Sequence, residues 1–128
     1  MNLYETVYVI KQDIRPEDLK PLEEKFENLL RLKKSSIEYK ENWGLRNLAY
    51  KIRNNKKGYY YFLVHNSEPE AVQELERNFT INENIIRFLT TKTDKVPSEP
   101  TPIMKTKIDR ENSERSVNEV ELNEKDNK

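Results

Sequence analysis

The stretch that decides the fold is WGLRNLAYKIRNNKKGYYYFLV, residues 43–64. Apolar and aromatic residues flank the polar run Asn54-Asn55-Lys56-Lys57-Gly58, whose asparagines and glycine tolerate positive φ and therefore favour a tight turn. We expect strands over residues 36–53, interrupted at Trp43-Gly44, and over residues 58–66. The sequence thus predicts a long β-hairpin with a basic tip.

Charge is concentrated on this hairpin. From Lys40 to Gly58 there are six lysines or arginines against one acid, Glu41, although the whole chain has 23 basic and 23 acidic residues. Nucleic acids bind such surfaces, because cations displace the counterions condensed on phosphates and exposed rings can stack on unpaired bases. The hairpin is therefore a candidate nucleic-acid surface.

Composition limits the rest of the chain. The 128 residues suit one small domain, which we expect to span residues 1–96, where all the aromatic residues lie. From residue 97 onward there is no aromatic residue, and prolines recur, so residues 97–128 are expected to form an extended, largely disordered tail. Cysteine is absent, and no apolar run reaches the roughly 20 residues that span a bilayer. We expect a soluble, cytoplasmic protein that does not bind membranes.

The remaining elements complete a regular order. Residues 3–10 read as a central strand, and apolar spacing over residues 17–32 predicts a helix with Asp18 as its N-cap. Ser67 and Glu70 have the spacing of a capping box at the start of a second helix, and residues 85–92 read as the last strand. The order βαββαβ predicts an α+β, ferredoxin-like fold, a four-stranded antiparallel sheet with both helices on one face.

Several segments resemble one family of ribosomal proteins. They are the Tyr4-Glu5 opening, residues 43–52, the Gly58-Tyr59-Tyr60 strand start, residues 82–87 and residues 100–105. Their order and spacing over residues 3–105 resemble the sixth protein of the bacterial small ribosomal subunit. The resemblance implies a non-catalytic protein of the cytoplasmic ribosome. It further implies that the chain binds the central domain of 16S ribosomal RNA as a heterodimer with the eighteenth small-subunit ribosomal protein, among other small-subunit proteins.

Arginines in the matching segments are expected to make the main RNA contacts, because a guanidinium can bind a phosphate through two hydrogen bonds or stack on a base. The cations of the hairpin tip would hold further phosphates, and nearby rings would stack. For Trp43 the favoured alternative is structural, with Gly44 forming a bulge that turns the ring inward. The predicted RNA-binding residues are Arg46, Lys51, Arg53, Lys56, Lys57, Arg87, Tyr50 and Trp43.

The protein partner is expected on the open face of the sheet and on the tail. An aromatic and aliphatic face that no helix covers would be an exposed apolar patch, and such patches usually mark interfaces. For Tyr8, Tyr60 and Phe62 the alternative is that they fill the domain's own core, since the sequence does not fix the strand register. The predicted partner contacts are Tyr4, Tyr8, Tyr60, Phe62, Met104 and Lys105.

The sequence lacks the residues that the common kinds of enzyme active site need. The single histidine, His65, has only Ser67 nearby, which does not make a triad, and two glycines in all exclude the phosphate-binding loops. We expect no catalytic residue, metal, cofactor or small-molecule substrate. Two alternatives share the predicted topology: an RNA-recognition-motif module, whose pattern Lys57 to Phe62 half fits, and a regulatory domain for a small ligand.

Overall fold

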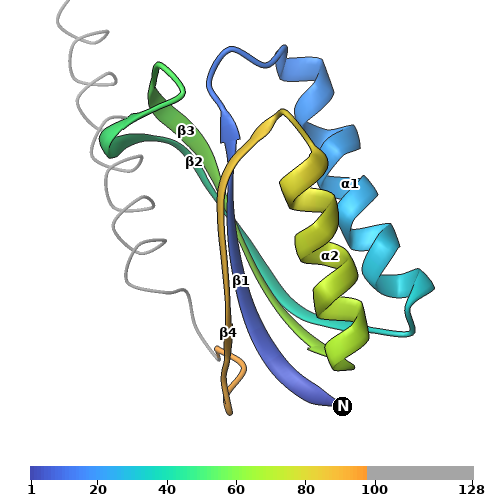
Figure 1. Cartoon of the computed structure of the whole chain (residues 1–128). Coiled ribbons are helices and arrows are strands. Elements are labelled where there is room, and N and C mark those ends of the chain that lie inside the picture. The colour runs from blue at the N-terminus through green and yellow to red at the C-terminus, as the bar shows by residue number, and fades with distance from the viewer. Residues whose placement is uncertain (98–128) are drawn as a thin grey trace, which may run out of the picture. The chain divides into compact units, whose positions relative to one another are not determined.

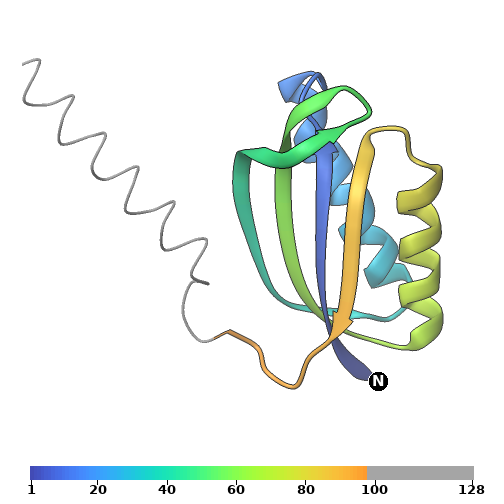
Figure 2. The same cartoon turned by 60° about the vertical axis from the view of Figure 1, so that its left-hand side comes forward.

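Four strands and two helices follow one another in the predicted order. The computed structural model describes residues 1–97, with β1 (Asn2–Lys11), α1 (Pro16–Leu32), β2 (Ser36–Ile52), β3 (Asn55–Ser67), α2 (Pro69–Ile81) and β4 (Ile85–Lys92). The strands form one antiparallel sheet in the order β2-β3-β1-β4, and both helices cover one of its faces (Figure 1, Figure 2). The predicted α+β, ferredoxin-like fold is confirmed. The predicted tail lies outside the described residues, apart from Pro97.

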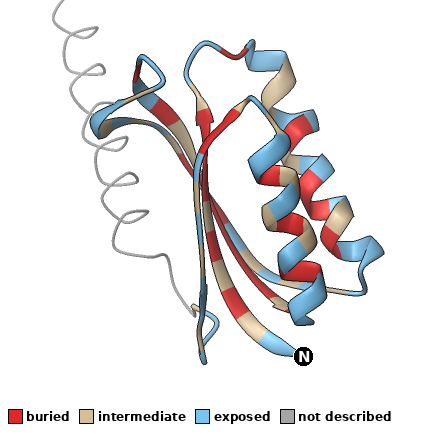
Figure 3. Ribbon diagram, viewed as in Figure 1, coloured by how far each residue is buried: buried red, intermediate tan, exposed pale blue. Residues whose placement is uncertain are grey.

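The core fills the space between the sheet and the helices. At its centre the ring of Tyr8 contacts Phe26 of α1, Phe79 of α2 and Tyr61 of β3. Figure 3 shows buried residues along the strands and on the inner sides of both helices. Because burying a large apolar side chain contributes roughly 1.5–3 kcal/mol, this layer holds the two helices on the sheet.

The first helix begins earlier than its predicted cap. Arg15 is the N-cap residue and Pro16 occupies the first turn, where the missing N–H of proline costs nothing. The prediction that Asp18 is the N-cap is wrong; its carboxylate instead accepts a 2.9 Å hydrogen bond from Arg15 Nε. Within residues 1–97 neither helix is long and apolar enough to cross a bilayer.

The second helix also begins without a side-chain cap. Glu68 is its N-cap residue, Pro69 follows, and no side chain binds the free amides of the first turn. The predicted capping box is wrong because the hydroxyl of Ser67 binds His65 within the sheet, at 2.7 Å. The serine hydroxyl therefore bonds a buried side chain and not the amides at the start of the helix.

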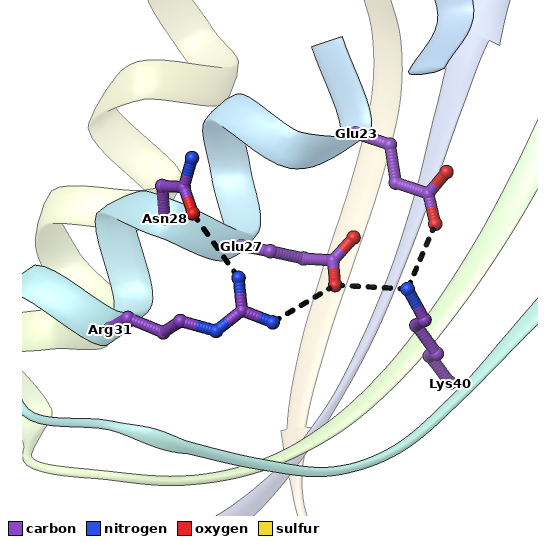
Figure 4. A network of polar contacts seen from close by, with 5 residues as sticks. All are labelled: Glu23, Glu27, Asn28, Arg31 and Lys40. Carbon is purple, nitrogen blue, oxygen red and sulfur yellow. Dashed lines mark hydrogen bonds and ion pairs between the residues drawn. The ribbon is translucent and has the colours of Figure 1, made fainter. Parts of the chain in front are cut away.

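A buried carboxylate fastens α1 to the edge strand β2. Glu27 is only 3% exposed, and its Oε1 lies 3.2 Å from Lys40 Nζ and 3.6 Å from Arg31 Nη2 (Figure 4). One turn earlier, Glu23 reaches the same ammonium group at 3.8 Å. Partial burial, together with the neighbouring carboxylate of Glu27, raises the pKa of Glu23. Since a buried carboxylate without a cation is costly, Lys40 fixes β2 against the helix.

Candidate nucleic-acid interface

The β2–β3 hairpin extends beyond its regular ladder. Regular pairing ends at Asn47 with Lys57 and resumes only for Ile52 with Asn55. Residues 48–51 of β2 therefore lie opposite a single residue of β3, and a bulge of this kind bends a strand. The tip accordingly curls away from the helices (Figure 1) and across the end of the sheet (Figure 2).

The turn at the tip is shorter than predicted. Arg53 and Asn54 have φ values of 50° and 66°, as the two central residues of a type I′ hairpin turn require. The prediction that Asn54 to Gly58 forms the turn is wrong, because β3 already begins at Asn55. No glycine occupies the two central positions, and the side-chain amide of Asn55 binds the carbonyls of Ile52 and Arg53 and so closes the turn.

Four cations project from the tip without acidic partners. Lys51, Arg53, Lys56 and Lys57 are exposed, and within residues 1–97 none of them takes part in an ion pair. Tyr50 lies in the same segment with 67% of its surface exposed, so its ring is accessible to a base. Unpaired cations beside an exposed ring form a surface suited to RNA.

The two arginines that are expected to make the main RNA contacts, Arg46 and Arg87, lie on the sheet. Arg46 is half-buried on β2 opposite Gly58, and Arg87 is exposed on β4 opposite Val9. A Cβ at Gly58 would meet the side chain of Val9, so these positions share the helix-free face. The structure therefore places both arginines on that face, with β3 and β1 between them, and not in the hairpin tip.

The helix-free face is open over β1 and β4. Val7, Val9, Tyr60, Arg87 and Leu89 line a shallow groove of about 250 Å³, and Leu89 is 63% exposed. An exposed apolar groove is typical of an interface. Sequence reasoning missed the three aliphatic residues; the available signal was the alternation along β1 and β4, which puts them opposite the core residues.

An aromatic cluster closes the other half of this face. The ring of Trp43 stacks on Phe62 and Tyr60, with centroids 5.4 and 6.3 Å apart, and Trp43 Nε1 donates a 2.8 Å hydrogen bond to Glu41. Gly44, with a φ of 77°, follows at a shift in register, so the predicted bulge is confirmed. Trp43 is only 8% exposed, which favours the structural alternative; its contact with RNA stays a prediction.

Two residues predicted for the partner interface lie on the helix side. Tyr8 is fully buried in the core, and Tyr4 is 7% exposed and stacks on His65 with centroids 5.9 Å apart. The alternation along β1 turns both side chains toward the helices, which favours a role in the domain's own core, and their contact with a partner stays a prediction.

The other predicted partner contacts differ in how accessible they are. Tyr60 is half-buried on the open face, where it lines the groove, and remains a predicted contact. Phe62 belongs to the same face but lies under Trp43, with 5% of its surface exposed. Met104 and Lys105 lie outside the described residues.

His65 is held as a neutral, structural side chain. Its Nε2 lies 2.8 Å from Thr6 Oγ1 and its Nδ1 lies 2.7 Å from Ser67 Oγ. Burial lowers the pKa of His65 to about 4. Both ring nitrogens are thus occupied, and in the described range 1–97 no group of three or more His, Cys, Asp or Glu side chains is placed to hold a metal ion.

Comparisons with known proteins agree with this structure. A family model described as ribosomal protein S6 matches residues 3–92. Small ribosomal subunit protein bS6 of Rickettsia prowazekii is 49% identical over 105 residues, which cover 82% of this chain and 87% of the relative. Its counterpart in Rickettsia bellii is 47% identical, over 82% of this chain and 88% of the relative.

A solved structure supports the fold. The crystal structure of 30S ribosomal protein S6 from Thermotoga maritima aligns with a TM-score of 0.69, at 24% identity, over 91% of this chain and 97% of that one. The resemblance seen in the sequence is confirmed. So is the expectation that the chain is not an enzyme, because its relatives are ribosomal proteins. The chain belongs to the ribosomal protein S6 family.

Proposed function

We propose that this protein is a structural component of the small subunit of the cytoplasmic ribosome and binds 16S ribosomal RNA through its hairpin tip. The observation that carries the proposal is the set of four exposed tip cations without acidic partners among residues 1–97, beside the exposed ring of Tyr50. Cations gain affinity for RNA by releasing counterions, and a ring gains it by stacking on a base. The family supports ribosomal RNA as the ligand.

The proposed protein partner is the eighteenth small-subunit ribosomal protein, docked on the helix-free face over β1 and β4. The groove between Val7, Val9 and Leu89 offers this partner an apolar surface, whereas the other half of the face is closed by Trp43. Arg87 borders the groove, so RNA that runs along the docked partner would meet its guanidinium.

Overall charge supports the proposal that a partner is needed. The 23 basic residues are balanced by 23 acidic ones, so long-range attraction of the whole chain to RNA is weak. The local excess at the hairpin tip acts only over about a Debye length, roughly 8 Å at physiological salt. A basic partner would bring RNA within that range.

A reconstitution tests both parts of the proposal. The affinity of a central-domain fragment of 16S ribosomal RNA is measured by filter binding for the chain alone, the partner alone and the equimolar pair. The pair should bind at least tenfold more tightly than either protein. Equal affinity of the chain alone and the pair would refute the need for a partner, and no binding by the pair would refute RNA recognition.

A matched pair of variants locates the docking face. Leu89→Asp places a charge in the groove and should abolish pairing, while Leu32→Asp alters a residue of α1 that is 84% exposed and should leave pairing intact. If both variants pair with the partner as the unmodified chain does, the partner does not dock on this face.

The recognition-motif alternative has less support. Such a module stacks bases on exposed rings of its central strands. Here Phe62 is 5% exposed under Trp43, and of the two central strands only β3 contributes a ring to the open groove, that of Tyr60. If Tyr60→Ala weakened RNA binding and left protein pairing unchanged, this alternative would replace the proposed arrangement.

A further inference from the structure

Three of the four tip cations lie beyond the regular pairing of β2 with β3. Beyond the pair of Asn47 with Lys57, pairing between β2 and β3 is interrupted until the single pair of Ile52 with Asn55, and Lys51, Arg53 and Lys56 all lie in this part of the hairpin. A mobile tip would lose conformational freedom when it bound RNA, and that loss would weaken binding. The affinity of the tip therefore depends on the contacts that fix it beforehand.

Gln12, in the connection between β1 and α1, makes two of these contacts. Its side-chain Oε1 accepts a 2.9 Å hydrogen bond from the backbone amide of Lys57, and its own backbone amide donates a 3.3 Å bond to Asn55 Oδ1. The first bond extends the β1–β3 ladder beyond its last pair, Lys11 with Gly58. The second reaches the residue that closes the turn.

Asn55 passes this restraint to the turn itself. Its Nδ2 donates to the carbonyls of Ile52 and Arg53, at 3.3 and 3.1 Å. Asn55 as a whole is only 9% exposed. Arg53 is held in addition by the 3.4 Å bond from its Nη1 to the carbonyl of Ile85. Gln12 thus restrains the tip at the last regular pair and, through Asn55, at the turn.

We propose that Gln12 is a positioning residue for the RNA contact, which it orders without touching RNA. This inference rests on the proposed function. The bond to Lys57 is exposed to solvent, so it contributes little to global stability and acts on the local order of the tip.

Three variants of the full chain, each paired with its protein partner, test this role. Gln12→Met keeps the length of the side chain and removes the acceptor, whereas Gln12→Glu keeps an acceptor for the Lys57 amide. Gln73→Met makes the same chemical change at an exposed position of α2 and serves as the control. The readouts are hydrogen exchange of the Lys57 amide in the free chain, thermal unfolding, and affinity for the central-domain RNA fragment as a function of salt.

In Gln12→Met the Lys57 amide should exchange severalfold faster, and RNA affinity should fall roughly twofold to tenfold, the loss expected for one hydrogen bond. The salt slope should not change, because no charge is removed. The unfolding temperature should match that of Gln73→Met, and Gln12→Glu should keep the Lys57 amide protected.

Three results would overturn the inference. RNA affinity of Gln12→Met equal to that of Gln73→Met would show that the restraint is irrelevant to binding. Weaker RNA binding with unchanged exchange of the Lys57 amide would make Gln12 a direct RNA contact. Weaker binding that only parallels a fall in unfolding temperature would indicate general destabilisation. Failure of the proposed function is distinguishable, because the pair containing unmodified Gln12 would then not bind RNA.

Discussion

Acidification should destabilise the protein through His65, the single histidine of the chain. Its ring lies in a row of buried and half-buried polar groups that runs from Thr90 of β4 to Ser35, just before β2. Ser67 Oγ donates to Ser35 Oγ at 2.7 Å and so accepts from Nδ1–H of His65, which leaves Nε2 to accept from the hydroxyl of Thr6. Thr6 Oγ1 in turn lies 3.1 Å from Thr90 Oγ1. This row is complete only when the imidazole is neutral.

The magnitude follows from the pKa of His65. Burial lowers that pKa from 6.5 to about 4 in the folded protein, while the unfolded chain keeps the ordinary value. Above pH 6.5 both states are neutral and the full contribution is present. As the pH falls from 6.5 toward 4, the unfolded chain takes up the proton first, and the free energy of unfolding declines by about 1.4 kcal/mol per pH unit, about 3 kcal/mol in all.

Urea unfolding between pH 7 and pH 5, compared with a His65→Gln variant, measures this loss. The carboxylates are common to both chains, so the difference between the two pH profiles belongs to His65. The unmodified chain should lose roughly 2 kcal/mol more than the variant over this range. Parallel profiles would refute the reasoning, as would an NMR titration of the folded protein in which the imidazole of His65 titrates near pH 6.5.

Three further substitutions probe packing and charge. Gly58→Ala should destabilise the protein by roughly 1–3 kcal/mol, because its Cβ would overlap with Cγ1 of Val9; an unchanged melting temperature would contradict this. Lys40→Met removes the cation 3.2 Å from the buried carboxylate of Glu27 and should cost about 1–2 kcal/mol in urea unfolding; unchanged stability would contradict this and show that Arg31 alone neutralises that carboxylate. Tyr8→Phe should leave the free energy of unfolding unchanged or raise it by up to about 1 kcal/mol, because the buried hydroxyl has no hydrogen-bond partner among residues 1–97; a loss above 1 kcal/mol would reveal such a partner.

The fold could be predicted because it depends on local patterns. The apolar spacing of residues 17–32 belongs to one helix face, and the polar run after Ile52 separates two strands of a hairpin. The order of the elements then leaves few topologies. The bulge at Gly44 was equally local, since a glycine beside a large aromatic residue interrupts the alternation of a strand.

The assignment of residues to faces could not be predicted in the same way. Residues 59–64 are apolar at every position, so their alternation cannot be read, and Tyr8 and Tyr60 look equivalent in the sequence although one is core and the other is open. The contact that restrains the tip could not be predicted from the sequence either, because Gln12 and Asn55 are 43 residues apart. Such contacts depend on tertiary structure alone.

The salt dependence of RNA affinity tests most directly whether the hairpin tip binds ribosomal RNA through its cations. For the chain paired with the eighteenth small-subunit protein, the slope of log affinity against log salt is compared with that of a Lys56→Gln/Lys57→Gln variant and a Lys20→Gln/Lys25→Gln control on α1. Removing two phosphate contacts should flatten the slope by roughly 1.5, while the control keeps the slope of the unmodified pair. Equal slopes for all three pairs would contradict the proposed contact.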